Sequence, residues 1–373
     1  MKNLSYKNIL IGSLQPWFSP LVNPHYLTLE LSRLQNQITF LEARRIGKLF
    51  SPRGAQSATR FHNLAPKTLT LRRFYVSPRI SGTRLLKSLG LTIVRRILGK
   101  SYDPQIIISF DPVFDVVQET YPNALKIYYC ADYLSANRVM ADAEKRLLSA
   151  CDIVIAASGR LFDELRMKHS CVRYVPHGVD LLPQYEDEKL EAHIAKLFAP
   201  FNNRPIFGFL GHISQNVDFD LIRYLARQNA NCIVALVGLQ AANVSRKVES
   251  LPRNVVCPGY VPSVGIKYCL KHFDVGLVPY IRSEYVLRSH PIKIMQYVAA
   301  GLPVVSTTVG EDFTGNGFVY QCGSYEEFSE MVRVAHEENC PESAERRVRY
   351  AKQHSWRSRV EEIDRIIEQG NVQ

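Results

Sequence analysis

The chain has 373 residues, of which 46% are hydrophobic, and carries a formal net charge of +11 at pH 7. This length suggests two domains of ordinary size, and the apolar and aromatic content excludes a disordered chain. A mean hydropathy of -0.11 argues against a membrane span, and so does the lack of any apolar run of about 18 residues. The first residues lack a signal-peptide cleavage pattern, so we expect a cytoplasmic protein.

The positive charge is concentrated in the first half of the chain. Residues 1–180 contain 25 Lys and Arg against 13 Asp and Glu, whereas residues 181–373 contain 21 against 22. Between Glu42 and Asp103 there are 14 basic residues and no acidic residue. Apolar residues recur at near-helical spacing within this stretch, which predicts a basic amphipathic helix built on Leu85, Leu86, Leu89, Ile93, Ile97 and Leu98.

A basic surface of this kind suits an anionic partner. Each basic residue near an anionic lipid surface contributes about 1 kcal/mol, so we expect residues 44–100 to meet an anionic membrane surface. Nucleic acid is a weaker alternative, because no nucleic-acid-binding module accompanies the charge, and we expect no nucleic acid partner. A solvated basic face without a partner remains open.

Short apolar runs rich in β-branched residues alternate with helix-like segments along the chain. These runs cover residues 8–12, 38–42, 105–110, 125–130, 152–158, 206–211, 232–238, 274–280 and 303–307. Continuous apolar strands separated by helices are typical of parallel sheets with helices on both faces. Because the runs fall into two sets on either side of the polar stretch 180–205, we expect two α/β domains with their boundary there.

Few features suggest a metal or a cofactor. The eight cysteines are scattered and lack the paired spacing of a zinc site, which favours free thiols. The acidic motif DFD at 218–220 stands where a helix should begin, so Asp218 is interpreted as a helix N-cap. We therefore predict no metal and no cofactor.

Several polar residues follow predicted strands, at the edge where open parallel sheets bind ligands. Asp132 comes after 125–130, His212 after 206–211, and Tyr280 closes 274–280. The loop after the first strand reads SLQPWFSP and has no GxGxxG, which argues against a dinucleotide-binding site of the usual kind. Trp17 and Phe18 in this loop are candidate contacts for a sugar or a lipid.

The segment HPIKIMQYVAAGLPVV, residues 290–305, predicts a short helix that begins at Pro291, ends at Gly301 and leads into a strand. Lys293 and Gln296 lie three residues apart, so they share one face near the helix N-terminus, where an anion is favoured. The residues alone leave two interpretations open: a diphosphate site, or an amphipathic surface helix with a solvated lysine.

The order of segments in the second half resembles the donor domain of GT-B glycosyltransferases, including family 4, over about residues 150–320. The segments are FGFLGHISQNVDFDLI, CIVALVG, NVVCPGYVPSVGIKYCLKHFDVGLVPY and HPIKIMQYVAAGLPVVST. LKIYYCADYLSAN and PHGVD are similar to the xanthan-type membrane-associated glucuronosyltransferase, which acts on a lipid-linked oligosaccharide. The resemblance implies a GT-B fold of two Rossmann-like α/β domains with parallel sheets facing a central cleft.

In domain terms, the resemblance implies an acceptor-binding, membrane-facing domain over 1–180 and a nucleotide-sugar donor domain over 181–350. It also implies a C-terminal helix within 351–373 that packs back toward the first domain. His177 and Asp180 are candidate residues lining the cleft. Without the resemblance, they would be ordinary loop residues.

The resemblance also implies roles for individual residues. Lys293 would neutralise the diphosphate and Gln296 would hydrogen-bond the ribose, while Asp132 would act as general base on the acceptor hydroxyl. Further donor-binding candidates are Tyr280, His212, Gly259 and Tyr260. The alternative for each is an ordinary one: a turn aspartate, a half-buried strand-end tyrosine or a loop histidine.

One departure from the family pattern shapes the expected reaction. Family 4 enzymes usually carry two glutamates around this helix, and here Arg288 and Gln296 stand at those positions. We therefore expect inverting transfer of a sugar. The resemblance to the xanthan-type enzyme implies UDP-glucuronate as the favoured donor and a lipid-linked glycan in surface polysaccharide synthesis as the acceptor. We expect a peripheral protein at the cytoplasmic face of the membrane. A retaining family 4-type enzyme and a catalytically inactive GT-B binding protein are the alternatives.

Overall fold

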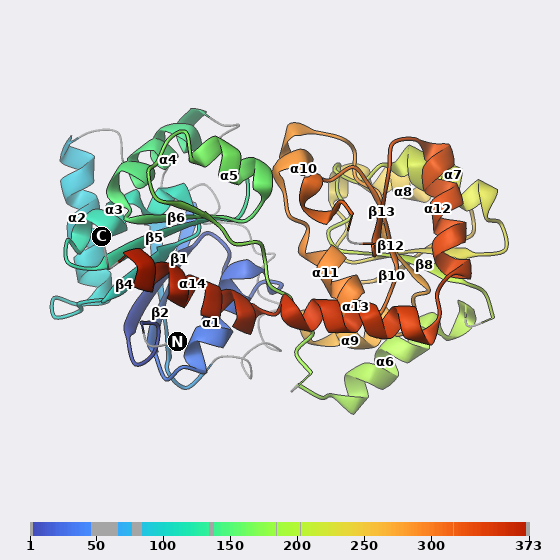
Figure 1. The fold of residues 1–373 in the computed structure, drawn as a ribbon, viewed down its shortest axis with the longest axis horizontal. Coiled ribbons are helices and arrows are strands. Elements are labelled where there is room, and N and C mark those ends of the chain that lie inside the picture. Colours follow the sequence, from blue (N-terminus) through green and yellow to red (C-terminus); the bar gives the residue numbers. More distant parts are fainter. Residues whose placement is uncertain are drawn as a thin grey trace. The chain divides into compact units, whose positions relative to one another are not determined.

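The computed structural model describes residues 3–45, 66–76, 84–133, 138–183, 185–201, 203–315 and 317–370. The chain divides into two compact units, the first formed by Met1–His177 with Trp356–Gln373 and the second by Gly178–Ser355. The expected domain ends, at residues 180 and 350, lie within five residues of these divisions. Each unit contains one parallel sheet with helices packed against it, so the predicted α/β class is confirmed (Figure 1).

Unit 1 contains a seven-stranded sheet in the order β3-β2-β1-β4-β5-β6-β7. The strand order reverses between β1 and β4, which is the topological switch point of a doubly wound sheet. The strands are β1 Asn8–Ser13, β2 Gln37–Arg45, β3 Leu69–Val76, β4 Ile106–Ser109, β5 Leu125–Cys130, β6 Ile153–Ala156 and β7 Val172–Tyr174. The helices are α1 Asn23–Ser32, α2 Arg84–Leu98, α3 Asp115–Thr120, α4 Arg138–Ala150, α5 Gly159–Leu165 and α14 Trp356–Gly370.

Unit 2 repeats this topology with six strands in the order β10-β9-β8-β11-β12-β13. Its switch point lies between β8 and β11. The strands are β8 Ile206–Leu210, β9 Ile233–Val237, β10 Val255–Gly259, β11 Val275–Val278, β12 Val304–Thr307 and β13 Val319–Cys322. The helices are α6 Glu188–Phe198, α7 Phe219–Gln228, α8 Ser245–Glu249, α9 Ile266–Leu270, α10 Glu284–Arg288, α11 Ile292–Ala299, α12 Tyr325–Glu337 and α13 Pro341–Gln353.

The apolar strands of unit 2 divide its core into two layers, one on each face of the sheet. Side chains alternate along a strand, so Ile206 and Leu210 of β8 join one buried cluster while Phe207 and Phe209 join the other. This two-sided burial explains why the central strands are apolar at nearly every position.

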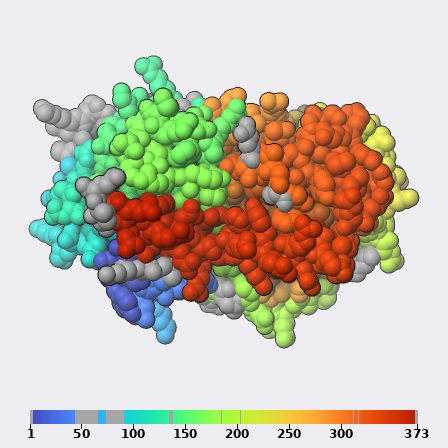
Figure 2. Space-filling view, in the orientation of Figure 1, coloured from blue at the N-terminus to red at the C-terminus, as the bar shows by residue number. Residues whose placement is uncertain are grey.

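The C-terminal helix α14 belongs to unit 1, where it packs beside α1 (Figure 2). Trp356 is 2% exposed and stacks on Tyr26 with ring centroids 6.2 Å apart. Further along the helix, a carboxylate oxygen of Asp364 accepts hydrogen bonds from the backbone N–H groups of Asn3 and Leu4 at 2.9 and 2.8 Å. Residues from the two ends of the chain therefore stabilise the same unit.

The basic stretch contains the predicted helix, observed as α2. Val94 and Leu98 pack into the core of unit 1, whereas Arg95 and Arg96 are exposed. The rest of the stretch lies largely outside the described residues. None of the helices that the structure describes is long and apolar enough to cross a membrane.

The polar stretch 180–205, where the sequence places the boundary, holds α6, which is capped by the Asp187 side chain and buries Leu190, Ile194 and Phe198 in unit 2. One interpretation of the sequence is corrected here. Trp17 is 1% exposed and packs edge-on against Phe40, so it is a core residue and cannot contact an acceptor. By contrast, the N-cap role of Asp218 is confirmed by its hydrogen bonds from the N–H groups of Asp220 and Leu221.

We expect Trp356→Ala to lower the free energy of unfolding of unit 1 by about 3–5 kcal/mol, since it removes a large buried ring. Urea unfolding followed by tryptophan fluorescence measures this directly, because the one remaining tryptophan, Trp17, reports on the same unit. Arg357→Ala, a change at an exposed position of the same helix, is the control. Equal midpoints for the two variants would show that Trp356 does not anchor α14.

Candidate functional site

The carboxyl ends of β8 and β11 lie side by side at the switch point of unit 2. Open α/β sheets bind ligands at such points, where helices leave in opposite directions. Gly211 and His212 follow β8, while Pro279 and Tyr280 follow β11. The candidate site is therefore built around these two strand ends.

Lys293, in the first turn of α11, reaches this switch point. Its Nζ donates a hydrogen bond of 2.5 Å to the Tyr280 hydroxyl and lies 4.0 Å from the centroid of the Phe209 ring. The side chain is buried, and burial lowers its pKa to about 7. Within the part of the chain that the structure describes, no carboxylate forms an ion pair with Lys293. Two aromatic rings and one hydroxyl are thus its main partners.

Tyr297 fixes α11 to the sheet one helical turn beyond Lys293. Its hydroxyl accepts a 2.7 Å hydrogen bond from the N–H of Leu210, at the end of β8, and donates a 3.3 Å bond to the carbonyl of Leu277 in β11. The ring packs against Gly276, where an added Cβ would lie 2.4 Å from a ring carbon. One buried hydroxyl therefore joins the helix to both strands of the switch point.

Glycines end three neighbouring strands beside Lys293. Gly211, Gly238 and Gly259 have φ angles of +146°, +145° and +108°, which side chains rarely tolerate. An added Cβ at Gly211 would lie 2.6 Å from Nζ of Lys293, and one at Gly238 would lie 1.9 Å from the Gly211 carbonyl oxygen. The strand ends therefore present bare backbone, which allows a ligand to approach closely.

Sequence reasoning found only Gly259 among these three residues. A signal was present, since the runs IFGFLG, CIVALVG and NVVCPG all end in glycine. The link of Tyr297 to the two strands depends on tertiary contacts that the sequence does not show.

The other predicted donor residues differ in burial. Gln296 is buried on α11, and His212 is exposed after β8. The hydroxyl of Tyr260, next to Gly259, is buried without a hydrogen-bond partner among the described residues, and burial raises its pKa. The structure thus brings Lys293 and Tyr280 into contact. Roles for Gln296, His212 and Tyr260 stay predictions.

In unit 1, Asp132 follows β5 at the carboxyl edge of the sheet. The residue is half-buried, and its carbonyl accepts a 3.7 Å hydrogen bond from the Cys130 thiol, whose pKa is raised by burial. Residues 134–137 of the same predicted motif lie outside the described residues. The role of Asp132 as a base stays a prediction.

The two candidates for cleft lining lie in different units. His177 is 3% exposed in unit 1, where Nε2 lies 3.0 Å from Nδ2 of Asn23 and the ring stacks near Tyr129. Asp180, in unit 2, accepts a 2.6 Å hydrogen bond from the N–H of Leu182, whose φ is +51°. Asp180 thus supports local backbone structure, whereas His177 packs against side chains of unit 1 that are distant in the sequence.

Among the residues that the structure describes, no three His, Cys, Asp or Glu side chains come together in a way that could hold a metal ion. The exposed thiols of Cys257 and Cys340 and the buried cysteines are all free.

The lowered pKa of Lys293 predicts a pH-dependent stability. Below pH 7 the lysine is protonated in both the folded and the unfolded chain, so it adds no pH dependence. Above pH 7 the folded chain releases the proton that the unfolded chain keeps up to its ordinary pKa of 10.5, so stability rises with pH. Between about pH 6 and about pH 9, the free energy of unfolding of the wild type should increase by about 1–3 kcal/mol more than that of Lys293→Met.

Urea unfolding of both proteins at the two pH values measures this difference. Lys196→Met removes an exposed lysine of the same unit and should show the same offset from the wild type at both values. An offset for Lys293→Met that does not change with pH would mean that Lys293 keeps its proton when folded.

Comparisons with known proteins bear on the second unit first. Residues 204–337 match the family model described as glycosyl transferases group 1. The chain is 26% identical over 224 residues to TuaH of Bacillus subtilis (strain 168), which is named as a candidate teichuronic acid biosynthesis glycosyltransferase. That match covers 53% of this chain and 54% of TuaH, so the chain matches about half the length of this relative.

Solved structures extend the comparison to the whole fold. HepE from Anabaena in complex with UDP and glucose is similar with a TM-score of 0.70 at 14% identity, over 97% of this chain and 99% of HepE. Sucrose-phosphate synthase from Thermosynechococcus elongatus gives 0.71 at 14% identity, over 97% and 98% of the two chains. At such identities these structures show the fold alone, here the predicted GT-B fold of two Rossmann-like units. The chain therefore has the GT-B fold, and its residues 204–337 match the family model of the glycosyl transferases group 1.

Proposed function

We propose that this chain transfers a sugar from a nucleotide diphosphate donor, with UDP as the preferred nucleotide, to a lipid-linked glycan in surface polysaccharide synthesis. The observation that carries the proposal is Lys293, a buried cation without a carboxylate partner at the switch point of the group 1 domain. A site of this kind is completed by an anionic ligand, because a buried charge is stable only when it is paired.

The donor diphosphate supplies the missing negative charge. Glycosyl transfer breaks the bond between the sugar and the diphosphate, so negative charge grows on the leaving group in the transition state. A protonated Lys293 stabilises that charge in a partly desolvated site, where electrostatic interactions are strong. We propose that the lysine does so without a metal ion, while Tyr280 keeps its Nζ in place.

The glycine strand ends suit the rest of the donor. Gly211, Gly238 and Gly259 carry no side chain, and the space beside Gly259 is open, so we propose that a phosphate or base lies against these strand ends. Gln296 and the loop at Tyr260 are proposed to bind the ribose and the base. UDP is preferred because HepE, which shares the fold, is described in complex with UDP and glucose. Glucuronate is the proposed sugar on resemblance alone.

The proposed base is Asp132. Inverting transfer needs a group that takes the proton from the acceptor hydroxyl as that oxygen attacks the anomeric carbon and the diphosphate leaves. A half-buried carboxylate at the carboxyl edge of the unit 1 sheet is suited to this role. Retaining transfer is a second candidate, which the resemblance of the second half to family 4 implies.

The acceptor side is proposed to work at the cytoplasmic face of the membrane. The exposed Arg95 and Arg96 of α2 lie within the basic stretch 44–100, and such residues attract anionic lipid headgroups. The candidate role of TuaH in teichuronic acid biosynthesis supports a surface polysaccharide as the product class. Unit 1 would then hold the lipid-linked acceptor.

Calorimetric titration with UDP, GDP and ADP tests the donor site. We expect one nucleotide to be preferred and its affinity to fall by at least about tenfold in Lys293→Met, since a charge-assisted contact is lost. Above pH 7 binding should take up a proton, because the diphosphate favours the charged lysine. Titrations in buffers of different ionisation enthalpy count that proton.

Lys196→Met, which removes a lysine exposed on α6, is the matched control and should bind as the wild type does. The donor-site proposal is wrong if Lys293→Met keeps full affinity or if no nucleotide binds at all.

The anomeric configuration of the product separates the two mechanisms. We expect NMR to show inversion relative to the donor sugar, and Asp132→Asn to lower kcat by at least about a hundredfold while nucleotide affinity is kept. Asp142→Asn, at an exposed position on α4, should be as active as the wild type. A retained configuration would select the retaining candidate and remove the base role from Asp132.

A further inference from the structure

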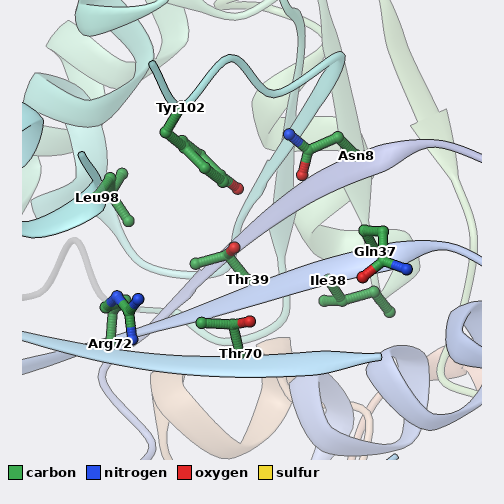
Figure 3. A pocket seen from close by; sticks show the side chains of 8 residues that line it. All are labelled: Asn8, Gln37, Ile38, Thr39, Thr70, Arg72, Leu98 and Tyr102. Atoms are coloured by element: carbon green, nitrogen blue, oxygen red, sulfur yellow. The ribbon is translucent and has the colours of Figure 1, made fainter. Parts of the chain in front are cut away.

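A polar cavity lies at the edge of the unit 1 sheet where β1 and β2 begin (Figure 3). Its volume is about 220 Å³, and it is lined by Asn8, Gln37, Ile38, Thr39, Thr70, Arg72, Leu98 and Tyr102. Asn8 and Gln37 are the first residues of their strands, whereas Asp132 follows the last residue of β5. Because the strands are parallel, the cavity lies at the opposite sheet edge from the proposed base.

The sheet face that forms this cavity is unusually polar. Thr39 pairs with Thr70 and Leu41 with Arg72 in the β2–β3 register, so all four side chains belong to one face. Leu41 joins the core beneath α2, whose last residue, Leu98, forms one wall of the cavity. Thr39 lies on the interior strand β2 and is 6% exposed, although strands of a parallel sheet are usually apolar on both faces. Thr70 and Arg72 belong to the edge strand β3, where polar residues are common, and they extend the polar face beside Thr39.

Tyr102 points its hydroxyl into the cavity. The hydroxyl is buried and faces Thr39, with which it makes at most a weak hydrogen bond, and burial raises the pKa of Tyr102 to about 12. An edge-on contact with Tyr121, at 5.9 Å between ring centroids, holds the ring. Tyr102 thus offers a buried hydrogen-bond donor to a ligand.

Arg72 supplies the positive charge. One of its N–H groups donates to the carbonyl of Leu71 at 3.3 Å, which leaves other guanidinium donors for a ligand. Thr39 and Thr70 add hydroxyls on the same face, and no lining residue is acidic. A guanidinium with convergent hydroxyl donors suits an oxyanion, and arginine matches phosphate geometry well.

The size of the cavity limits the ligand to a small group. It has room for about seven water molecules at roughly 30 Å³ each, and it is smaller than the roughly 300 Å³ at which pockets begin to enclose whole drug-sized ligands. A phosphate ester with a short polyol therefore fits, whereas a whole nucleotide sugar would extend out of the cavity. Asn8 and Gln37 at the rim can hydrogen-bond its hydroxyls.

We propose that this cavity binds a glycerophosphate group, a phosphate ester with free hydroxyls, presented as the headgroup of an anionic lipid. The membrane source follows from α2, which ends at the cavity wall and exposes Arg95 and Arg96. The inference rests on the proposed membrane attachment and deepens it, because the cavity would recognise a headgroup where surface charge alone would not.

Two probes test the site: sn-glycerol 3-phosphate in solution, and phosphatidylcholine vesicles with and without phosphatidylglycerol. Tyr102→Phe changes no charge and keeps the ring against Tyr121, yet should weaken flotation with phosphatidylglycerol vesicles about tenfold. Arg96→Gln removes one surface charge outside the cavity and should cost about fivefold. Arg72→Gln removes a charge and a ligand bond, so we expect a loss of roughly fiftyfold.

The headgroup site is overturned if Tyr102→Phe binds vesicles as the wild type does and Arg72→Gln behaves like Arg96→Gln. Tight binding of glycerol 3-phosphate with the same variant pattern, but no vesicle binding, would keep the phosphate site and overturn its lipid source. UDP titration of the same variants separates this proposal from the donor site, since Tyr102→Phe should leave nucleotide affinity unchanged. Thermal unfolding confirms that each variant is folded.

Discussion

The hydroxyl of Tyr297 is the contact on which the candidate donor site depends. It bonds the N–H of Leu210 and the carbonyl of Leu277, in the two strands that part at the switch point. Each bond contributes about 1 kcal/mol, but together they fix the rotation and height of α11 on the sheet. Lys293 lies one turn earlier on the same face, so its position follows from this attachment. A buried tyrosine with no chemical role thereby decides where the cation lies.

Burial of Lys293 has opposing effects on stability and binding. Desolvation disfavours its charged form, and the aromatic rings of Phe209 and Tyr280 offset only part of that cost. In the free protein Lys293 therefore loses its proton easily. It lies next to a strand end whose positive φ angle favours glycine. An arriving diphosphate restores the charge by pairing with it. The free energy needed to desolvate Lys293 is thus spent when the chain folds and not when the ligand binds, as is general for preorganised sites.

The sequence predicted the centre of each sheet better than its edges. The nine predicted strands correspond to the central strands, whereas all four that were missed, β3, β7, β10 and β13, are edge strands. An edge strand has one open side and is less strictly apolar, as the alternating LTLRRFYV of β3 shows. A continuous apolar run indicates a strand that is buried on both faces, so this signal predicts the interior strands and misses the edge strands.

Site prediction followed the same physical limits. Lys293 and Tyr280 were found because their positions at a helix start and a strand end are local features of the chain. The contact of Tyr297 with Leu210 and the approach of Gly211 to Lys293 join residues more than 80 positions apart, which a single sequence does not reveal. Trp17 was misjudged for a similar reason. A loop position suggested exposure, while Glu42, which accepts a hydrogen bond from the Trp17 backbone, draws the loop into the core.

Charge is used differently in the two halves of the chain. Residues 1–180 carry a large positive excess, much of it within one acid-free stretch, whereas residues 181–373 are nearly neutral. Exposed charge acts over distance but is screened beyond about 8 Å at physiological salt, which suits a reversible attraction to a surface. A single buried lysine in a neutral unit acts only at contact and is little screened. The first arrangement favours attachment to a membrane, and the second favours selection of one small anion.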